Sequence, residues 1–358
     1  MDSEWLKLKT AAPTVHSRGE NDADLRAAMV RRLLSRAVAS GSIVLPAVPA
    51  MIDDYMEMCT KTFSAIGVAF KDEELTQLRS ALDSQLAAAF SASPRSQIVI
   101  TYDSPNGLIV NYHVKAQWSS IEAAYDSWIA TRQPPLFGSE PDAKVLSLAA
   151  AATAPSNCPI LDLGAGTGRN ALELARRGHP VDALELTPKF AEILRQESQK
   201  ESLNVRVIER DIFSGTDDLR RDYWLILLSE VVSDFRSIDQ LRRMFELVAQ
   251  CLAPGGQLVF NAFVAKDSFT LGDATRQLGQ QTYSSIFSRS EIATAVASQP
   301  LTQESNESVY DYEKCHQPEG SWPPTGWYEN WVNGQDVFDI ERGVSPIEMR
   351  WFVYQKRN

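Results

Sequence analysis

Apolar and polar positions alternate with different periods in the two parts of the chain. Over residues 22–38, apolar side chains recur at helical spacing opposite a row of arginines, which predicts an amphipathic helix. Gly41 and Pro46 then break this pattern. Two more helices are expected at about 48–63 and 72–90, so the first part of the chain is predicted to be mainly helical.

A period-two pattern follows these helices. Residues 97–102 and 108–114 are rich in β-branched and aromatic side chains, and the turn between them contains Asn106-Gly107, which is typical of a β-hairpin. A hairpin alone is marginally stable in water, so it should pack on the helices, on the rest of the chain or on a second copy. A homodimer is therefore one expectation, and residues 1–117 are predicted to form an accessory module.

The most informative stretch is a short apolar run that changes into alternating glycines. Residues 160–163 fit a strand buried on both faces, as in a parallel sheet. Gly164, Gly166 and Gly168 allow positive φ and a close approach of a ligand. Residues 169–177 have helical periodicity, so the whole stretch is predicted to be a strand, a turn and a helix.

Similar runs recur downstream and predict an α/β fold with a doubly covered sheet. The further strands are expected at 180–186, 205–212, 223–228, 308–313 and 349–354. Residues 252–260 are expected to form the end of a helix, a Pro-Gly-Gly turn and another strand. Ser288 and Glu291 fit a capping box at the start of another helix. A helix is also expected at 119–129, and the segment 133–138 with its two prolines is a candidate hinge.

Composition limits the functional classes. The chain has 358 residues, 44% hydrophobic and 23% charged, which is typical of a soluble globular protein of two units. The net charge of −11 argues against general nucleic-acid binding. The four cysteines show no C-x-x-C spacing, and no metal is predicted. No leader or long apolar run is evident, so a cytoplasmic protein without membrane contact is expected.

The glycine spacing and one acid indicate the kind of cofactor. A dinucleotide fingerprint needs a third glycine at position 169, where this chain has Arg169. Asp162 directly before the turn would repel a pyrophosphate and attract an ammonium or sulfonium group. A cationic cofactor is therefore favoured over a nicotinamide cofactor.

Residues 161–168 resemble the first motif of the class I S-adenosylmethionine (SAM) dependent methyltransferases. The resemblance covers about 140–262 well and the C-terminal strand moderately, while the first 115 or so residues match no family. It implies SAM as cofactor and a seven-stranded Rossmann-like sheet whose last strand is antiparallel. The methyltransferase domain is then expected at 118–358, with an aromatic-rich insertion at 315–345.

The resemblance also implies which residues hold the cofactor. Glu185, about 20 residues after the turn, is placed to accept hydrogen bonds from ribose hydroxyls. Asp211 resembles the contact to the adenine amine, with Ile212 against the ring. Tyr125 either closes over the methionine end or packs in the core. The complete set of expected cofactor residues is Tyr125, Asp162, Gly164, Gly166, Gly168, Glu185, Leu186, Asp211, Ile212 and Ser229.

Methyl transfer needs an oriented acceptor that can lose a proton. Glu230, after the fourth strand of the sheet, is the first catalytic candidate, although Ser229 and Glu230 could instead cap a helix. His316 is the second candidate, and its alternative is an ordinary surface histidine. Substrate contacts could also come from Gln280, Gln281, Tyr283 and Ser284.

The aromatic rings and carboxylates of 315–345 suit an amine, a guanidinium or a flat ring, or else they pack the segment in place. The favoured function is methyl transfer to nitrogen or oxygen of a small-molecule acceptor. A peptide or protein methyltransferase and a non-catalytic SAM-binding protein remain alternatives, and a nicotinamide oxidoreductase is disfavoured.

Overall fold

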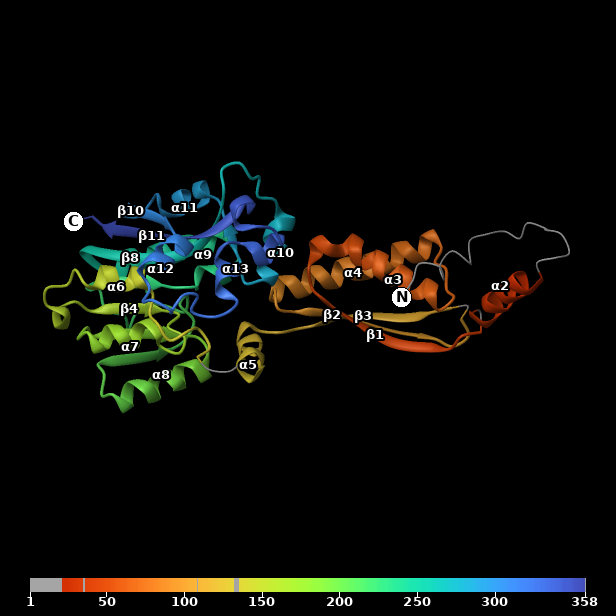
Figure 1. The fold of residues 1–358 in the computed structure, drawn as a ribbon, viewed down its shortest axis with the longest axis horizontal. Helices are drawn as coiled ribbons and strands as arrows, with labels where there is room; N and C mark the ends of the chain where they lie inside the picture. Colours follow the sequence, from red (N-terminus) through yellow and green to blue (C-terminus); the bar gives the residue numbers. More distant parts are fainter. Residues whose placement is uncertain (1–20, 35, 108, 132–134, 358) are drawn as a thin grey trace. The chain divides into compact units, whose positions relative to one another are not determined.

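The computed structural model describes residues 21–34, 36–107, 109–131 and 135–357, and it divides into two compact units (Figure 1). The units are Met1–Ile121 and Glu122–Asn358, so they separate four residues after the boundary expected at 117/118. Residues 1–20 lie outside the described residues. The same holds for Gln133 and Pro134 of the candidate hinge.

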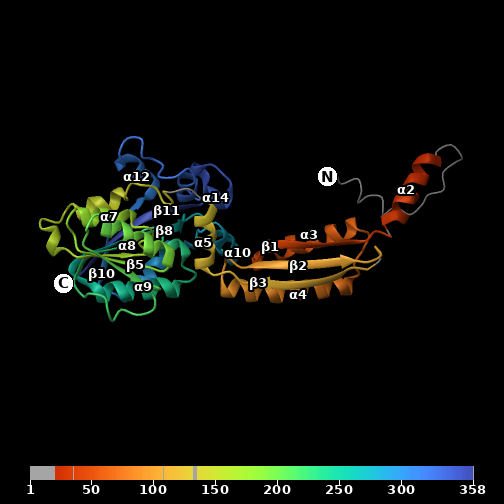
Figure 2. The same ribbon diagram turned by 90° about the horizontal axis from the view of Figure 1, so that it is seen from below.

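The first unit is a three-stranded antiparallel sheet with two long helices on one face (Figures 1 and 2). Its core is formed by buried residues of both helices, among them Phe63 and Leu82, packed on Ile98 and Ile100. Its elements are α2 (Asn21–Leu34), β1 (Ala39–Pro46), α3 (Ile52–Ala65), α4 (Asp72–Ala92), β2 (Gln97–Ser104) and β3 (Asn111–Gln117).

The predicted hairpin is present as β2 and β3. Gly41 and Pro46 were expected only to break the helical pattern, but they belong to a third strand of this sheet, β1. Gly41 lies opposite Tyr102 in the sheet, and a Cβ there would come within 2.8 Å of the tyrosine Oη, so glycine makes room for the ring. Pro46 ends the strand, where its missing N–H interrupts little of the ladder. Glycine and proline therefore belong to a strand here.

The second unit contains the sheet predicted from the resemblance. The strand order is β10-β11-β8-β7-β4-β5-β6, and the short β9 pairs with β8. β11 is antiparallel to both β8 and β10, whereas β4 to β8 are parallel, which confirms the seven-stranded fold with an antiparallel last strand. The strands are β4 (Ile160–Leu163), β5 (Val181–Glu185), β6 (Val205–Glu209), β7 (Tyr223–Leu228), β8 (Leu252–Ala265), β9 (Ile286–Phe287), β10 (Leu301–Ser308) and β11 (Ile347–Lys356).

Helices cover both faces of this sheet (Figure 1). One face packs against α9 and α11, and the other packs against helices that include α6, α7 and α12. The helices are α5 (Ile121–Thr131), α6 (Ala143–Ala149), α7 (Arg169–Arg176), α8 (Pro188–Lys200), α9 (Ile238–Cys251), α10 (Asp273–Gln281), α11 (Arg289–Val296), α12 (Val309–His316), α13 (Tyr328–Val332) and α14 (Gln335–Phe338).

The prediction of a strand at 308–313 is wrong, because Ser308 caps helix α12 and residues 309–313 lie in it. Ser308 ends β10 and caps the helix, since its hydroxyl accepts the N–H of Asp311 at 3.3 Å. Val309 and Glu313 are both buried at helical spacing. The true sixth strand, β10, is an edge strand of mostly polar residues and carries no apolar alternation that sequence analysis could detect.

The capping box at α11 is confirmed, because Ser288 Oγ accepts from the Glu291 amide at 3.2 Å and Glu291 accepts from the Ser288 amide at 2.8 Å. The four cysteines are all free. Within the part of the chain that the structure describes, no helix is long and apolar enough to cross a membrane.

Candidate active site

The glycine turn follows β4 and has the predicted backbone. Gly164, Gly166 and Gly168 have φ values of 78°, 57° and 95°. A Cβ on Gly164 would overlap the Val231 side chain, and one on Gly168 would overlap Leu194, so both glycines are also required by packing. The turn therefore brings the strand directly into α7 with its amide groups at the carboxyl edge of the sheet.

Glu185 connects this turn to the end of β5. Its Oε2 accepts the N–H of Gly166 at 2.8 Å, and its Oε1 accepts the N–H of Thr187 at 2.7 Å. Burial raises the pKa of Glu185, and these two backbone donors act against the rise. Each oxygen keeps a second lone pair, so the carboxylate fits the role of a ribose acceptor. Leu186 beside it is half-buried.

Asp162 is buried in the middle of β4 with 2% of its surface exposed. Burial raises its pKa to about 8, the nearby carboxylate of Asp142 adds to the rise, and Arg169 opposes it. A cationic group brought to this site would favour the ionised form of Asp162. The buried acid thus fits a sulfonium cofactor.

The residues expected around adenine lie after β6. Asp211 is exposed, and its Oδ1 accepts the N–H of Phe213 at 2.6 Å, which fixes the loop. Ile212 packs partly buried against the apolar core beneath the sheet edge. Both residues follow β6, the strand that pairs with β5, which is where the resemblance places the contacts to adenine.

Arg169 is the centre of a buried charged network that sequence analysis missed. Its guanidinium donates to both oxygens of Asp142 at 2.7 and 3.2 Å and to Glu230 Oε1 at 2.8 Å. Ser229 Oγ donates to Asp142 at 2.6 Å, so it is not a helix cap. In the sequence, the only sign of this network was Arg169 itself, which occupies the position where a dinucleotide site would have glycine.

Glu230 has an unusual backbone for its residue type. Its φ is 61°, in the left-handed region that non-glycine residues rarely occupy. Its N–H donates to Asn261 Oδ1 at 2.7 Å, and its carbonyl accepts from Ser233 Oγ at 2.8 Å, so neighbouring side chains hold the conformation. Burial raises the pKa of Glu230 to about 7 against the lowering effect of Arg169. Strain of this kind is concentrated at functional sites.

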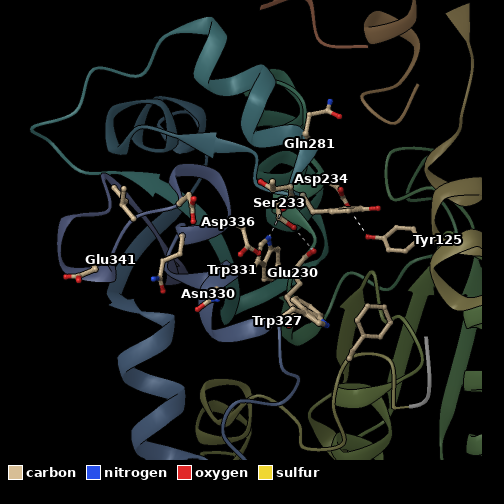
Figure 3. A pocket seen from close by; sticks show the side chains of 16 residues that line it. Tyr125, Glu230, Ser233, Asp234, Gln281, Trp327, Asn330, Trp331, Asp336 and Glu341 are labelled. Atoms are coloured by element: carbon tan, nitrogen blue, oxygen red, sulfur yellow. Dashed lines mark hydrogen bonds between the residues drawn. The ribbon is translucent and has the colours of Figure 1, made fainter. Parts of the chain in front are cut away.

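A cavity of about 700 Å³ opens beside Glu230 (Figure 3). It is formed by α5, the segment after β7, the end of α10 and the insertion between β10 and β11. Its aromatic lining residues are Tyr125, Phe137, Tyr283, Trp327 and Trp331, and its carboxylates are Glu230, Asp234, Asp336, Asp339 and Glu341.

Tyr125 reaches this cavity from α5. Its hydroxyl donates to Asp234 Oδ2 at 2.8 Å (Figure 3), and its ring lies edge-on to Phe190 with a centroid distance of 5.6 Å. Of the four polar candidates after β8, Gln281 and Tyr283 line the cavity. Gln280 and Ser284 are buried and do not line it.

His316 lies elsewhere. It ends α12 with an exposed ring whose Nδ1–H donates to the Tyr312 carbonyl at 2.8 Å, and the ring stacks on that tyrosine. It lines a separate cavity of about 620 Å³, which Glu230 does not line. The structure therefore does not bring the two catalytic candidates together. Within the described residues, no group of three or more His, Cys, Asp or Glu side chains is placed to hold a metal ion.

Residues 160–256 match the family model of a methyltransferase domain. This segment includes the glycine turn, Glu185 and Glu230, and it forms four consecutive parallel strands and the start of a fifth. This part of the chain therefore matches a methyltransferase domain, as its resemblance to the SAM-dependent enzymes implied. A comparison with curated protein sequences gives no match.

Solved structures with a similar fold include several methyltransferases. Geranyl diphosphate C-methyltransferase from Streptomyces coelicolor A3(2) is 15% identical, with a TM-score of 0.48 over 60% of this chain and 74% of that one. A putative sarcosine dimethylglycine methyltransferase from Galdieria sulphuraria is 18% identical, with a TM-score of 0.45 over 60% and 84%. The [4+2]-cyclase SpnF is 14% identical, with a TM-score of 0.44 over 60% and 80%. Identities this low do not define a shared substrate.

Proposed function

We propose that the protein transfers the methyl group of SAM to a nitrogen or oxygen atom of a small-molecule acceptor held beside Glu230. The observation that supports this proposal is the cavity of about 700 Å³ at the end of β7, which has the size and mixed lining of small-molecule sites. The cavity lies at the end of β7, which pairs with β4, so an acceptor bound there would share one edge of the sheet with a cofactor held by the glycine turn.

The cofactor would be held by residues of the first three parallel strands and their loops. Asp162 and the three glycines would take the methionine end, Glu185 with Leu186 the ribose, and Asp211 with Ile212 the adenine. Ser229 and Tyr125 would lie near the reacting end. When bound, SAM supplies a methyl group that passes to an acceptor lone pair while both electrons of the broken carbon–sulfur bond stay on sulfur.

Glu230 would orient the acceptor and take its proton. A carboxyl group with a pKa of about 7 exists in both protonation states near neutral pH, which suits a proton acceptor. Arg169 holds the carboxylate in place with a hydrogen bond of 2.8 Å, and aromatic rings line the cavity beside it. His316 has no role in this proposal.

The experiment that tests the cofactor site is calorimetric titration with SAM, with its demethylated product and with NAD. We expect SAM and the product to bind and NAD not to bind. Asp162→Ala and Glu185→Ala should each weaken SAM binding by about tenfold or more, because each removes a buried carboxylate from the site. Unchanged affinity in both folded variants would contradict the assignment.

The acceptor class is tested next by mass spectrometry of methylated products. Small amines, phenols and alcohols are offered together with a peptide library and SAM. Methylation of small molecules would support the proposal, whereas methylation of peptides alone would favour a peptide methyltransferase. SAM binding without turnover on any acceptor would favour a non-catalytic SAM-binding protein.

A further inference from the structure

We propose that the acceptor is an organic cation, an amine or a guanidinium, bound between the aromatic rings and the carboxylates of the cavity beside Glu230. This inference rests on the proposed function, because it concerns the same site. It narrows the acceptor from nitrogen or oxygen compounds in general to compounds that are positively charged at neutral pH.

The first argument is the charge of the lining. Among the residues that the structure describes, five carboxylates line the cavity, and no Lys, Arg or His lines it. The guanidinium of Arg169 lies beside Glu230 but is already shared with Asp142, so the positive charge there is outnumbered. A cavity lined by one sign of charge concentrates ligands of the opposite sign.

The second argument is that three of these carboxylates have no cation of their own. Asp336, Asp339 and Glu341 form no ion pair or side-chain hydrogen bond with any residue that the structure describes. Their neighbour Arg342 pairs instead with Asp311 at 2.6 Å. These acids therefore face the cavity with their charge available to a ligand.

The third argument is the geometry of the aromatic rings. Trp327 and Trp331 both line the cavity, and they pack edge-to-face with their centroids 5.5 Å apart at an interplanar angle of 70°. Trp331 is fixed because its Nε1–H donates to the Thr282 carbonyl at 3.0 Å. A tryptophan face attracts an ammonium or guanidinium group, and it attracts such a cation most strongly where water is excluded.

Figure 3 shows how these groups are distributed. Glu230 and the two tryptophans lie in the middle of the labelled residues, and Tyr125 and Glu341 lie on opposite sides of them. A cationic acceptor would place its reacting nitrogen at Glu230, which takes the proton that the nitrogen must lose. Phosphate or carboxylate groups on an acceptor would meet only like charge along the rest of the wall.

The test uses the full chain with SAM and matched acceptors that differ in charge. A panel of small molecules is arranged in triplets such as 2-phenylethylamine, 2-phenylethanol and 3-phenylpropanoate, and methyl transfer is followed by mass spectrometry at neutral pH. We expect the methylated members to be the cations. Their KM should rise with salt concentration, because the attraction is partly screened.

Variants then test the carboxylates. Asp336→Asn and Asp339→Asn should each raise the KM for the cationic acceptor by about tenfold, since each removes one unit of attracting charge. The control is Asp267→Asn, an equal change of charge at an exposed residue outside the cavity, and it should leave the KM unchanged. SAM affinity reports that each variant is folded.

The possible failures are distinguishable. Methylation of neutral or anionic members in preference to the cations would overturn this inference and leave the proposed function intact. An unchanged KM in both Asp336→Asn and Asp339→Asn would also overturn it. SAM binding with no methyl transfer to any member of the panel would overturn the proposed function and this inference together.

Discussion

Glu230 shows how a single residue acquires chemical properties that its type alone does not have. Its backbone is left-handed, its side chain is 13% exposed, and its carboxylate shares Arg169 with Asp142. Each feature depends on a group distant in the sequence, such as the Asn261 side chain that receives its N–H. The pKa of Glu230 is therefore set by tertiary structure.

Glu230→Gln is the sharpest test at this scale. Because burial raises the pKa of Glu230 to about 7, the ionised form that accepts a proton predominates above that pH, so kcat/KM of the wild type should rise with pH through about 7. The glutamine variant should lose this rise and about 100-fold or more of kcat, while SAM affinity is retained. Glu192→Gln on the exposed face of α8 is the control. An unaltered pH profile in Glu230→Gln would exclude Glu230 as the proton acceptor.

Asp162 links stability to pH. Its pKa is raised from 3.8 in the unfolded chain to about 8, so the folded state binds the extra proton between these values. The contribution of Asp162 to the free energy of unfolding should be fully present below about pH 4 and lost as the pH rises through about 8. Asp162→Asn stays neutral, so its stability relative to the wild type should grow as the pH rises from about 4 to about 8 and then stay constant. Thermal unfolding of both proteins across this range measures the difference, and parallel curves would refute the explanation.

At the scale of elements, Glu313 joins three of them. From α12 it accepts the N–H groups of Ala143 and Lys144 at 2.8 and 3.2 Å, at the start of α6. It also accepts the indole N–H of Trp351 in β11 at 2.9 Å. One buried carboxylate thus caps a helix and connects it to the sheet.

Glu313→Ala should cost about 3 kcal/mol or more of the free energy of unfolding, because two buried donors and one half-buried donor lose their acceptor. Asp311→Ala is the matched control on the same helix, since its carboxylate is exposed and pairs with Arg342, and it should cost less than about 1 kcal/mol. Denaturant unfolding measures both. Equal losses in the two variants would show that the connection made by Glu313 contributes little.

Sequence patterns predicted the apolar strands of the sheet interior, but they failed for the polar strand at the sheet edge. β4, β5 and β7 lie in the sheet interior, so their apolar runs were readable. The polar edge strand β10 has no such run, and the alternation at 308–313 was instead one face of α12. In the site, the glycines and acids after the strands follow a local pattern, whereas the pairing of Arg169 with Asp142 joins residues 27 positions apart.

At the scale of the whole molecule, each unit has a hydrophobic core of its own. Buried residues between Leu45 and Ala116 form the core of the first unit, and those between Val145 and Tyr354 form the two clusters of the second. We expect residues 122–358 alone to fold and to bind SAM within about threefold of the full chain, because every proposed cofactor residue lies in this segment. Calorimetry of the isolated segment tests this, and the full chain is the reference. Loss of folding or of SAM binding would show that the first unit supports the second.

The insertion between β10 and β11 provides Trp327, Trp331 and three of the acids around the cavity, and none of the residues proposed to hold SAM. Substitutions in this insertion can therefore accumulate without loss of the methyl donor. An enzyme with a different acceptor could therefore arise by changes within residues 315–345, with the residues proposed to hold SAM left unchanged. Exchange of this segment with that of a related enzyme would then change the acceptor specificity and keep the SAM site.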